Sequence, residues 1–119
     1  MIKNSIIIII LSLSSLLNAE SLMKNEINHL LAYVKNTKCI YIRNDDSYNG
    51  LEAVKHINNK YKYFKDDINS AEDFIRLSAT QSLMFKNKYY IKCPNKKRVE
   101  SSKWLLIELK SYRDKRALK

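Results

Sequence analysis

One stretch, from Tyr48 to Phe64, has the pattern of a capped amphipathic helix. Asn49 can accept a hydrogen bond from the free backbone N–H groups of the first turn. Glu52, three residues later, completes a capping box, although Ser or Thr is the usual residue at its first position. Apolar side chains then recur at helical spacing and predict one buried face. They are Ala53, Val54, Ile57, Tyr61 and Phe64.

A polar line follows the edge of this predicted face. Glu52, His56 and Lys60 are spaced four residues apart, so that their side chains should stack along the helix, with Tyr63 beside them. One interpretation is a solvated flank, where each pair contributes about 0.2–0.5 kcal/mol. The other is a ligand site, because a histidine held by a carboxylate titrates near neutral pH. The sequence leaves both interpretations open.

Residues 1–19 have the pattern of a secretory signal peptide. Lys3 supplies a positive start, Ile6–Leu17 is an apolar run interrupted only by serines, and the small residue Ala19 follows. This pattern predicts cleavage after about Ala19. The run is shorter than the roughly 20 residues that span a bilayer, and an uncleaved anchor is the alternative. We therefore expect one domain over residues 20–119, located in the periplasm or secreted, with no transmembrane segment.

The mature chain would be strongly basic. Removing Lys3 leaves 21 basic residues against 12 acidic ones, a net charge of +9. Such a chain could meet anionic lipid, cell-wall polymer or nucleic acid. However, the chain is also rich in Ile, Asn and Lys and has one Gly, which is the bias of an AT-rich genome. We therefore expect no specific nucleic-acid partner, and adhesion through bulk charge remains an alternative function.

The chain has two cysteines, Cys39 and Cys93. In an oxidising compartment an even number of cysteines in a small domain predicts a disulfide. Closing a loop of about 54 residues would contribute roughly 4 kcal/mol by the chain-entropy estimate. A catalytic pair would need close C-x-x-C spacing or a neighbouring base. Since His29 and His56 lack paired ligand spacing, we expect no metal and no cofactor.

The remaining pattern predicts three more helices and two strands in an α+β fold. The helices are expected over 21–36, after Ser70, and from Ser101 or Ser102 to about Tyr112. The strands are expected at Cys39–Arg43 and at Tyr89–Cys93, where Pro94 stops the second. Turns or loops fill Asn44–Ser47, Ala79–Lys88 and Asn95–Val99, His29 is surface, and the tail Arg113–Lys119 frays. About four helices should therefore pack around a small two-stranded ribbon stapled by one disulfide.

Motifs for known chemistry are missing from the sequence. No G-x-S-x-G, H-E-x-x-H or phosphate-binding glycine loop occurs. A small envelope hydrolase or transferase with His56 as general base is nevertheless an alternative function. The run Lys60–Lys65 interleaves lysines with aromatic residues and could stack bases or sugars. Equally, Tyr61 and Phe64 could belong to the core, with the lysines as a solvated rim.

An ordered set of residues resembles a known family over nearly all of the mature chain. The set comprises Ile27, Leu30, Leu31, Val34, Cys39, Arg43-Asn44, Tyr48, Glu52-Ala53, His56, Lys60-Tyr61, Tyr63, Ala71–Ile75, Ala79-Thr80, Tyr89, Cys93, Trp104-Leu105 and Tyr112-Arg113. It resembles an uncharacterised family of small exported bacterial proteins, the domain of unknown function 5329 family. The resemblance implies a Gram-negative exported protein, supports the Cys39–Cys93 disulfide, and implies no activity.

The chain departs from the family pattern in two places. The turn after Arg43-Asn44 usually opens with glycine, where Asp45 stands here. The segment before the second strand is usually small and rich in serine and glycine, whereas here it is Leu83–Lys86. If that segment forms a site in relatives, its chemistry differs in this chain.

The leading hypothesis is a periplasmic, non-catalytic binding or interaction protein of the cell envelope. Its candidate ligand-binding residues are Arg43, Tyr48, Glu52, His56 and Lys60. Arg43 and Lys60 would attract an anionic group, Glu52 would orient His56, and Tyr48 would add a hydroxyl and an apolar face. The partner would be an envelope ligand or protein, with an anionic group as the favoured chemistry.

Overall fold

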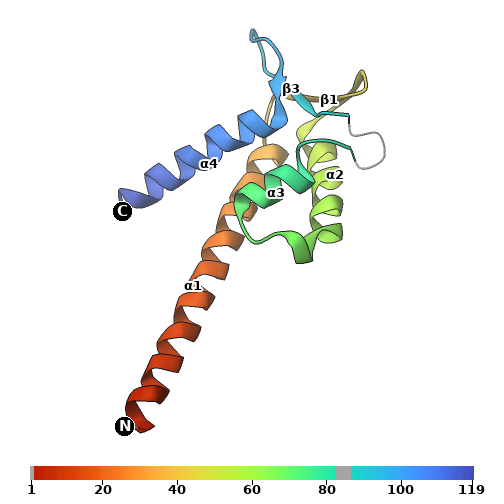
Figure 1. Cartoon of the computed structure of the whole chain (residues 1–119). Coiled ribbons are helices and arrows are strands. Elements are labelled where there is room, and N and C mark those ends of the chain that lie inside the picture. The colour runs from red at the N-terminus through yellow and green to blue at the C-terminus, as the bar shows by residue number, and fades with distance from the viewer. Residues whose placement is uncertain (1, 83–86) are drawn as a thin grey trace.

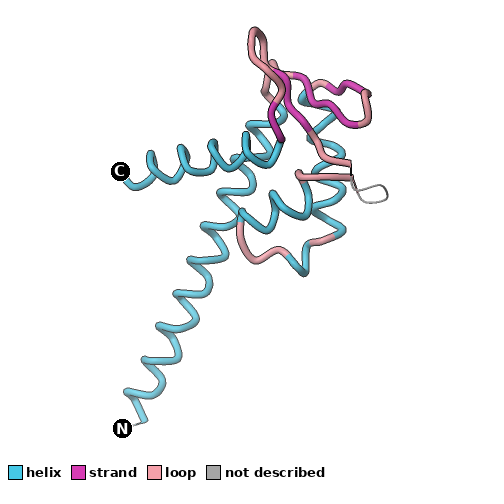
Figure 2. The backbone as a smooth tube through the Cα atoms, turned by 45° about the horizontal axis from the view of Figure 1, so that its top comes forward, coloured by secondary structure: helices cyan, strands magenta, loops and turns pink. Residues whose placement is uncertain are grey.

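Four helices and a small antiparallel sheet make up an α+β fold in the computed structural model, which describes residues 2–82 and 87–119 (Figure 1). The helices are α1 (Ile2–Lys35), α2 (Gly50–Tyr63), α3 (Ala71–Ser78) and α4 (Ser101–Ala117), with a short 3-10 turn η1 (Lys65–Asp67). The strands are β1 (Ile40–Arg43), β2 (Asp46–Tyr48), β3 (Tyr90–Lys92) and β4 (Val99–Glu100). The strands gather at one end of the helices (Figure 2).

The sheet has four strands in the described part of the chain, so the prediction of a two-stranded ribbon was wrong. The strand order is β2-β1-β3-β4, and every neighbouring pair is antiparallel. The two predicted strands form its centre as β1 and β3. The edge strands β2 and β4 are three and two residues long and carry Asp46, Ser47 and Glu100. Such short polar segments lack the alternating apolar pattern that identifies a strand.

A two-residue loop joins β1 to β2. Asn44 and Asp45 have φ angles of 52° and 66°, as a type I′ hairpin turn requires at both positions. Asn and Asp tolerate this conformation better than other non-glycine residues, but glycine adopts it without steric strain. The glycine expected in relatives at the position of Asp45 therefore has a conformational reason.

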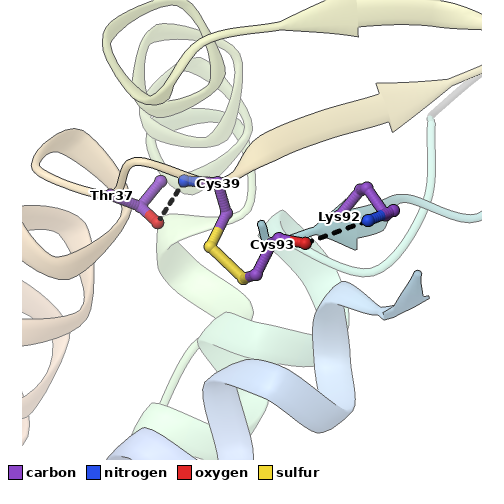
Figure 3. The surroundings of a disulfide bond; sticks show 4 residues. All are labelled: Thr37, Cys39, Lys92 and Cys93. Atoms are coloured by element: carbon purple, nitrogen blue, oxygen red, sulfur yellow. Dashed lines mark hydrogen bonds between the residues drawn. A yellow bond between two sulfur atoms is a disulfide. The ribbon is translucent and has the colours of Figure 1, made fainter. Parts of the chain in front are cut away.

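The predicted disulfide between Cys39 and Cys93 is present (Figure 3). The two Cα atoms are 4.2 Å apart, just beyond the pairing of Ile40 with Lys92. The bond therefore closes one end of the central strand pair, and the predicted adjacency of the two strands is confirmed. The Cys39 amide donates to Thr37 Oγ1 at 3.1 Å, and Lys92 Nζ donates to the Cys93 carbonyl at 3.0 Å.

The core lies between the inner face of the sheet and the helices. Its most deeply buried apolar side chains come from all four helices and from β3. They are Ile27, Leu30, Val34, Ile57, Ala71, Phe74, Ile75, Ile91, Leu105 and Leu109, with Ala79 directly after α3. The predicted buried faces of the helices are therefore confirmed in their central residues, whereas Met23, Leu31, Val54, Tyr61 and Phe64 pack at the margin of the core.

Helix α1 runs from Ile2 to Lys35, so the cleavage expected after Ala19 falls inside it. Over the residues that the structure describes, no helix combines the length and apolar character needed to cross a membrane.

The only glycine of the chain begins α2. A Cβ atom at Gly50 would lie 2.3 Å from the carbonyl oxygen of Val34 and 2.8 Å from that of Lys35. The start of α2 therefore packs directly on the backbone at the end of α1, which a larger residue would prevent. The predicted capping box is present at the same place, since Asn49 and Glu52 each accept from the other's backbone N–H.

A network of ion pairs fixes α4 to α1 and α3. Arg113 donates to both carboxylate oxygens of Glu26 at 2.7 and 2.9 Å, and Arg116 adds a bond at 3.0 Å. Arg113 also binds Glu72 at 2.9 Å. The expectation that residues from Arg113 onward fray was therefore wrong, because α4 continues to Ala117 and its arginines neutralise the buried carboxylate of Glu26.

Two other predictions for α1 and α4 need correction. His29 was expected on the surface, but its Nε2 lies 2.9 Å from Glu108 Oε2 and its ring stacks on Tyr112. Ser101 was a candidate helix cap, but it is the first residue of α4 and its buried hydroxyl donates to Tyr41 at 3.0 Å. In both cases a partner distant in the sequence determines the position of the side chain.

Replacing both Cys39 and Cys93 with serine should lower the free energy of unfolding by about 4 kcal/mol, because the unfolded chain loses a closed loop of 54 residues. Urea unfolding of the oxidised protein and of the variant measures this difference. An unchanged denaturation midpoint would show that the disulfide adds no stability.

The variant Glu26→Gln should lower the free energy of unfolding by about 3 kcal/mol, because two arginines lose a buried partner. Hydrogen bonding to Arg113, aided by Arg116, holds the Glu26 pKa below its usual value. A lowered carboxyl pKa stabilises the fold above the unfolded pKa, and this contribution is lost as the pH falls through the folded pKa.

The deficit of Glu26→Gln should therefore be constant above about pH 5 and shrink in more acidic solution. Glu72→Gln is the matched control, since Glu72 also binds Arg113 but is exposed, and its loss should stay below about 1 kcal/mol. Equal deficits in the two variants would contradict a special role for the buried carboxylate.

Candidate functional site

A narrow pocket lies between the β1–β2 hairpin and α2. It is lined by Tyr41, Ile42, Arg43, Tyr48, Ala53, His56, Ile57 and Tyr89. The free volume inside it is about 10 Å³, which is enough for about one water molecule. A larger ligand would therefore enter only if a side chain at its rim moved.

Three of the five predicted site residues meet at this pocket. Arg43 Nη2 donates to the Tyr48 hydroxyl at 3.1 Å, and its guanidinium lies 5.5 Å from the centre of the Tyr48 ring. The ring of Tyr48 in turn meets the His56 ring edge-on, with centroids 5.1 Å apart. The strand register makes this possible because Tyr48 pairs with Tyr41, whose side chain faces the core.

Lys60 lies behind the pocket and is only 7% exposed. Its Nζ donates to the Tyr89 hydroxyl at 3.1 Å and to the backbone carbonyl of Gln81. The sequence placed Lys60 at the end of a polar line along the helix edge. Its spacing of three residues from the buried Ile57 was the available signal that it could turn inward.

Glu52 uses its carboxylate at the start of α2. It accepts from the Asn49 amide at 3.2 Å, as part of the capping box. The described residues include no hydrogen bond between Glu52 and His56. The structure therefore groups Arg43, Tyr48 and His56. It places Lys60 behind the pocket, next to Tyr89, and Glu52 at the start of α2.

Tyr89 connects the pocket with Lys60, whereas the sequence identified it as a strand residue and a member of the family pattern, with no role in the site. It is buried and lines the pocket, while its hydroxyl accepts the hydrogen bond from Lys60. Burial raises the pKa of the Tyr89 phenol, and the nearby Arg43 guanidinium partly offsets this effect. Only the tertiary fold brings Tyr89 next to α2, so no local sequence pattern could have assigned it.

The charges around Tyr89 are positive. Within the described residues, neither Arg43 nor Lys60 forms a salt bridge with a carboxylate. Burial, together with the nearby charge of Arg43, lowers the pKa of Lys60 to about 8. Two cations without a salt bridge, together with two tyrosine hydroxyls, can hold an anionic group. No three His, Cys, Asp or Glu side chains in the described ranges cluster closely enough for a metal ion.

The model of the family described as "Family of unknown function (DUF5329)" matches residues 21–113. The chain belongs to this family. The matched region contains every residue that lines the pocket, as well as the disulfide. Comparisons of the DUF5329 chain with curated proteins and with solved structures find no match. The chemistry of the site must therefore come from its own geometry.

The two departures expected from the DUF5329 pattern differ in their relation to the pocket. Asp45 occupies the turn next to Arg43 and keeps the conformation that glycine would adopt there. The segment Leu83–Lys86 lies outside the described residues.

The free energy of unfolding of this DUF5329 domain should rise in alkaline solution, and Lys60→Met should abolish this rise. The folded pKa of about 8 is below the usual lysine value of 10.5. Between these values the unfolded chain binds a proton that the folded chain does not, so stability rises with pH. Relative to Lys60→Met, the wild type should gain about 1 kcal/mol between pH 8.5 and pH 9.5.

Urea unfolding at these two pH values tests this expectation. The exposed Lys62 on the same helix provides the control variant Lys62→Met, which should keep the alkaline rise. Parallel pH profiles for the wild type and Lys60→Met would contradict it.

Proposed function

We propose that this protein is an exported, non-catalytic binding domain of the cell envelope, and that its pocket takes an anionic group of a small ligand or partner. The pattern of residues 1–19 and the disulfide support export, because disulfides persist in oxidising compartments. The observation that carries the binding proposal is the buried Lys60 amine on the Tyr89 hydroxyl, with Arg43 lining the same pocket as Tyr89. Neither cation forms a salt bridge with a carboxylate of the described residues.

A buried lysine without a counter-charge is energetically costly, since burial disfavours its charged form. A neighbouring carboxylate would remove much of this cost, but the described residues of the pocket contain none. An anionic ligand would supply the missing charge. In this proposal, binding stabilises the protonated form of Lys60 and therefore raises its pKa from about 8.

Each pocket residue has a separate role in this proposal. Arg43 binds the anion directly, because its planar guanidinium matches a carboxylate or phosphate. Tyr48 exchanges its hydrogen bond with Arg43 for one with the ligand. His56 lies exposed at the rim and adds a ring nitrogen, whereas Lys60 contributes charge from behind Tyr89. Glu52 supports the site by capping the helix that carries His56.

The apolar part of the lining indicates the kind of anion. Ala53 and Ile57 of α2 provide the pocket with an apolar wall beside the Arg43–Tyr48 pair. A carboxylate attached to a small apolar body satisfies both parts of the lining, whereas a bare phosphate satisfies only the charged part. Benzoate is therefore the first probe, with inorganic phosphate as the charged comparison and benzyl alcohol as the neutral one.

Arg43→Gln should weaken benzoate binding by about tenfold or more, because a charge-assisted hydrogen bond is lost. Titration followed by NMR signals of Tyr48, His56 and Tyr89 measures the affinity. Arg98→Gln is the matched control, since Arg98 also lies over a tyrosine, Tyr90 at 4.2 Å, but outside the pocket. His56→Ala should weaken binding without lowering the melting temperature, as its side chain is exposed.

The comparison probes define the outcomes that count against the proposal. Equal affinity of benzyl alcohol and benzoate would show that the anion is not recognised. Equal binding of benzoate by the wild type and Arg43→Gln would exclude the pocket as the binding site. The affinity for benzoate should also fall between pH 7 and pH 9, as Lys60 loses its proton with a pKa of about 8.

A further inference from the structure

The sheet has a second face, on the opposite side from the core. Alternation along the strands turns Tyr41 and Ile91 inward, where they are 3% and 0% exposed. Ile40, Ile42 and Tyr90 alternate with these two residues along the strands and therefore lie on the other face, where Ile40 is 47% exposed. We call these three residues, together with Lys92, the outer sheet face.

The β3–β4 hairpin extends this face with positive charge. Lys92, Lys96, Lys97 and Arg98 are all exposed and fall within seven residues of the sequence. The hairpin projects away from the helices at one end of the molecule (Figure 1). None of the four forms a salt bridge within the part of the chain that the structure describes.

Carboxylates near this surface do not neutralise it. Glu100 in β4 is paired with Lys88 at 3.1 Å, so that this pair carries no net charge. Asp45 lies in the β1–β2 turn and borders the same shallow depression as Arg98. One unpaired carboxylate against four cations leaves the hairpin strongly positive.

Apolar side chains lie among these cations. Ile40 in β1 pairs with Lys92 and is 47% exposed, and Ile42 on the same face is partly exposed. Exposed aliphatic side chains within a basic surface are typical of proteins that bind at the headgroup level of a bilayer. The lysine side chains can place their aliphatic stems along the apolar surface while their ammonium groups reach phosphates.

The alternative occupant of a basic and aromatic surface is a single-stranded nucleic acid. Its bases would need a free aromatic ring for stacking. However, the ring of Tyr90 on the outer sheet face is covered by the Arg98 guanidinium, 4.2 Å from the ring centre. Charge and exposed aliphatic groups remain available, and these suit a lipid surface better than a base.

We propose that the outer sheet face and the β3–β4 hairpin dock onto an anionic phospholipid surface. Lys92, Lys96, Lys97 and Arg98 bind headgroup phosphates, and Ile40 inserts between the headgroups. The pocket at Arg43 belongs to the other side of the sheet, because Arg43 alternates with Ile42 along β1. Docking therefore leaves the pocket accessible, and this proposal does not depend on the ligand of the pocket.

Vesicle flotation tests the proposal with the protein purified from the exported fraction of expressing cells. The vesicles contain phosphatidylcholine alone, or phosphatidylcholine mixed with phosphatidylglycerol. The wild type should bind only the mixed vesicles, and added salt should release it because salt screens the attraction. All variants share one N-terminus, so residues near that end cannot account for differences between them.

A triple variant of the hairpin, Lys96→Gln, Lys97→Gln and Arg98→Gln, should lose binding by about tenfold or more, since each basic residue at an anionic surface adds attraction. The matched control removes the same charge from α4 through Lys103→Gln, Lys110→Gln and Lys115→Gln, three exposed positions. This control should retain most of the binding. Ile40→Ser should weaken binding without changing the charge.

Three results would overturn the proposal. Equal losses in the two triple variants would show attraction by bulk charge alone. Equal binding to both vesicle types would show non-specific apolar adsorption. Binding of a single-stranded oligonucleotide that depends on the hairpin, without vesicle binding, would identify nucleic acid as the occupant. Arg43→Gln should bind vesicles like the wild type. A failure of the membrane proposal can therefore be distinguished from a failure of the pocket proposal.

Discussion

The contact between Gly50 and the end of α1 determines where the site forms. With no Cβ atom at this position, the first residue of α2 packs on the carbonyl groups of Val34 and Lys35. Because β2 ends at Tyr48, only one residue separates it from this fixed point. Tyr48 is therefore held beside the second turn of α2, where it meets His56. The pocket follows from a backbone contact, although none of its polar side chains makes that contact.

Two other interactions, a disulfide and a group of ion pairs, hold the segments that complete the site. The disulfide fixes the central strands β1 and β3 at one end, so that Arg43 of β1 and Tyr89, just before β3, come to the same pocket. On the far side of the core, Glu26 binds arginines of α4 and thereby joins the first and last helices. The site is thus composed of segments whose positions depend on contacts between distant parts of the sequence.

The sequence predicted features that local patterns determine. The helix faces and the Asn49–Glu52 capping box are in this class, whereas the disulfide followed from the even number of cysteines. Local patterns also predicted a Glu52–His56 pair, which competes with the cap for one carboxylate. A helix cap contributes about 1 kcal/mol, whereas an exposed pair four residues apart contributes about 0.2–0.5 kcal/mol, so the cap prevails. The edge strands and the role of Tyr89 depend on tertiary partners, for which a single sequence has no signal. The spacing of Lys60 from Ile57 allowed its burial but did not require it.

The positions of the lysines show which of them the amino-acid composition alone can explain. An AT-rich genome can account for many exposed lysines, since an exposed lysine costs the fold little. It does not account for Lys60, because burying this amine lowers its pKa and weakens the fold wherever the amine stays protonated. At α4 the chain does place a carboxylate against half-buried cations, since Glu26 of α1 binds Arg113. The lack of such a partner at Lys60 in the described structure is therefore a local property of the pocket, and an anion supplied from outside the chain would compensate for it.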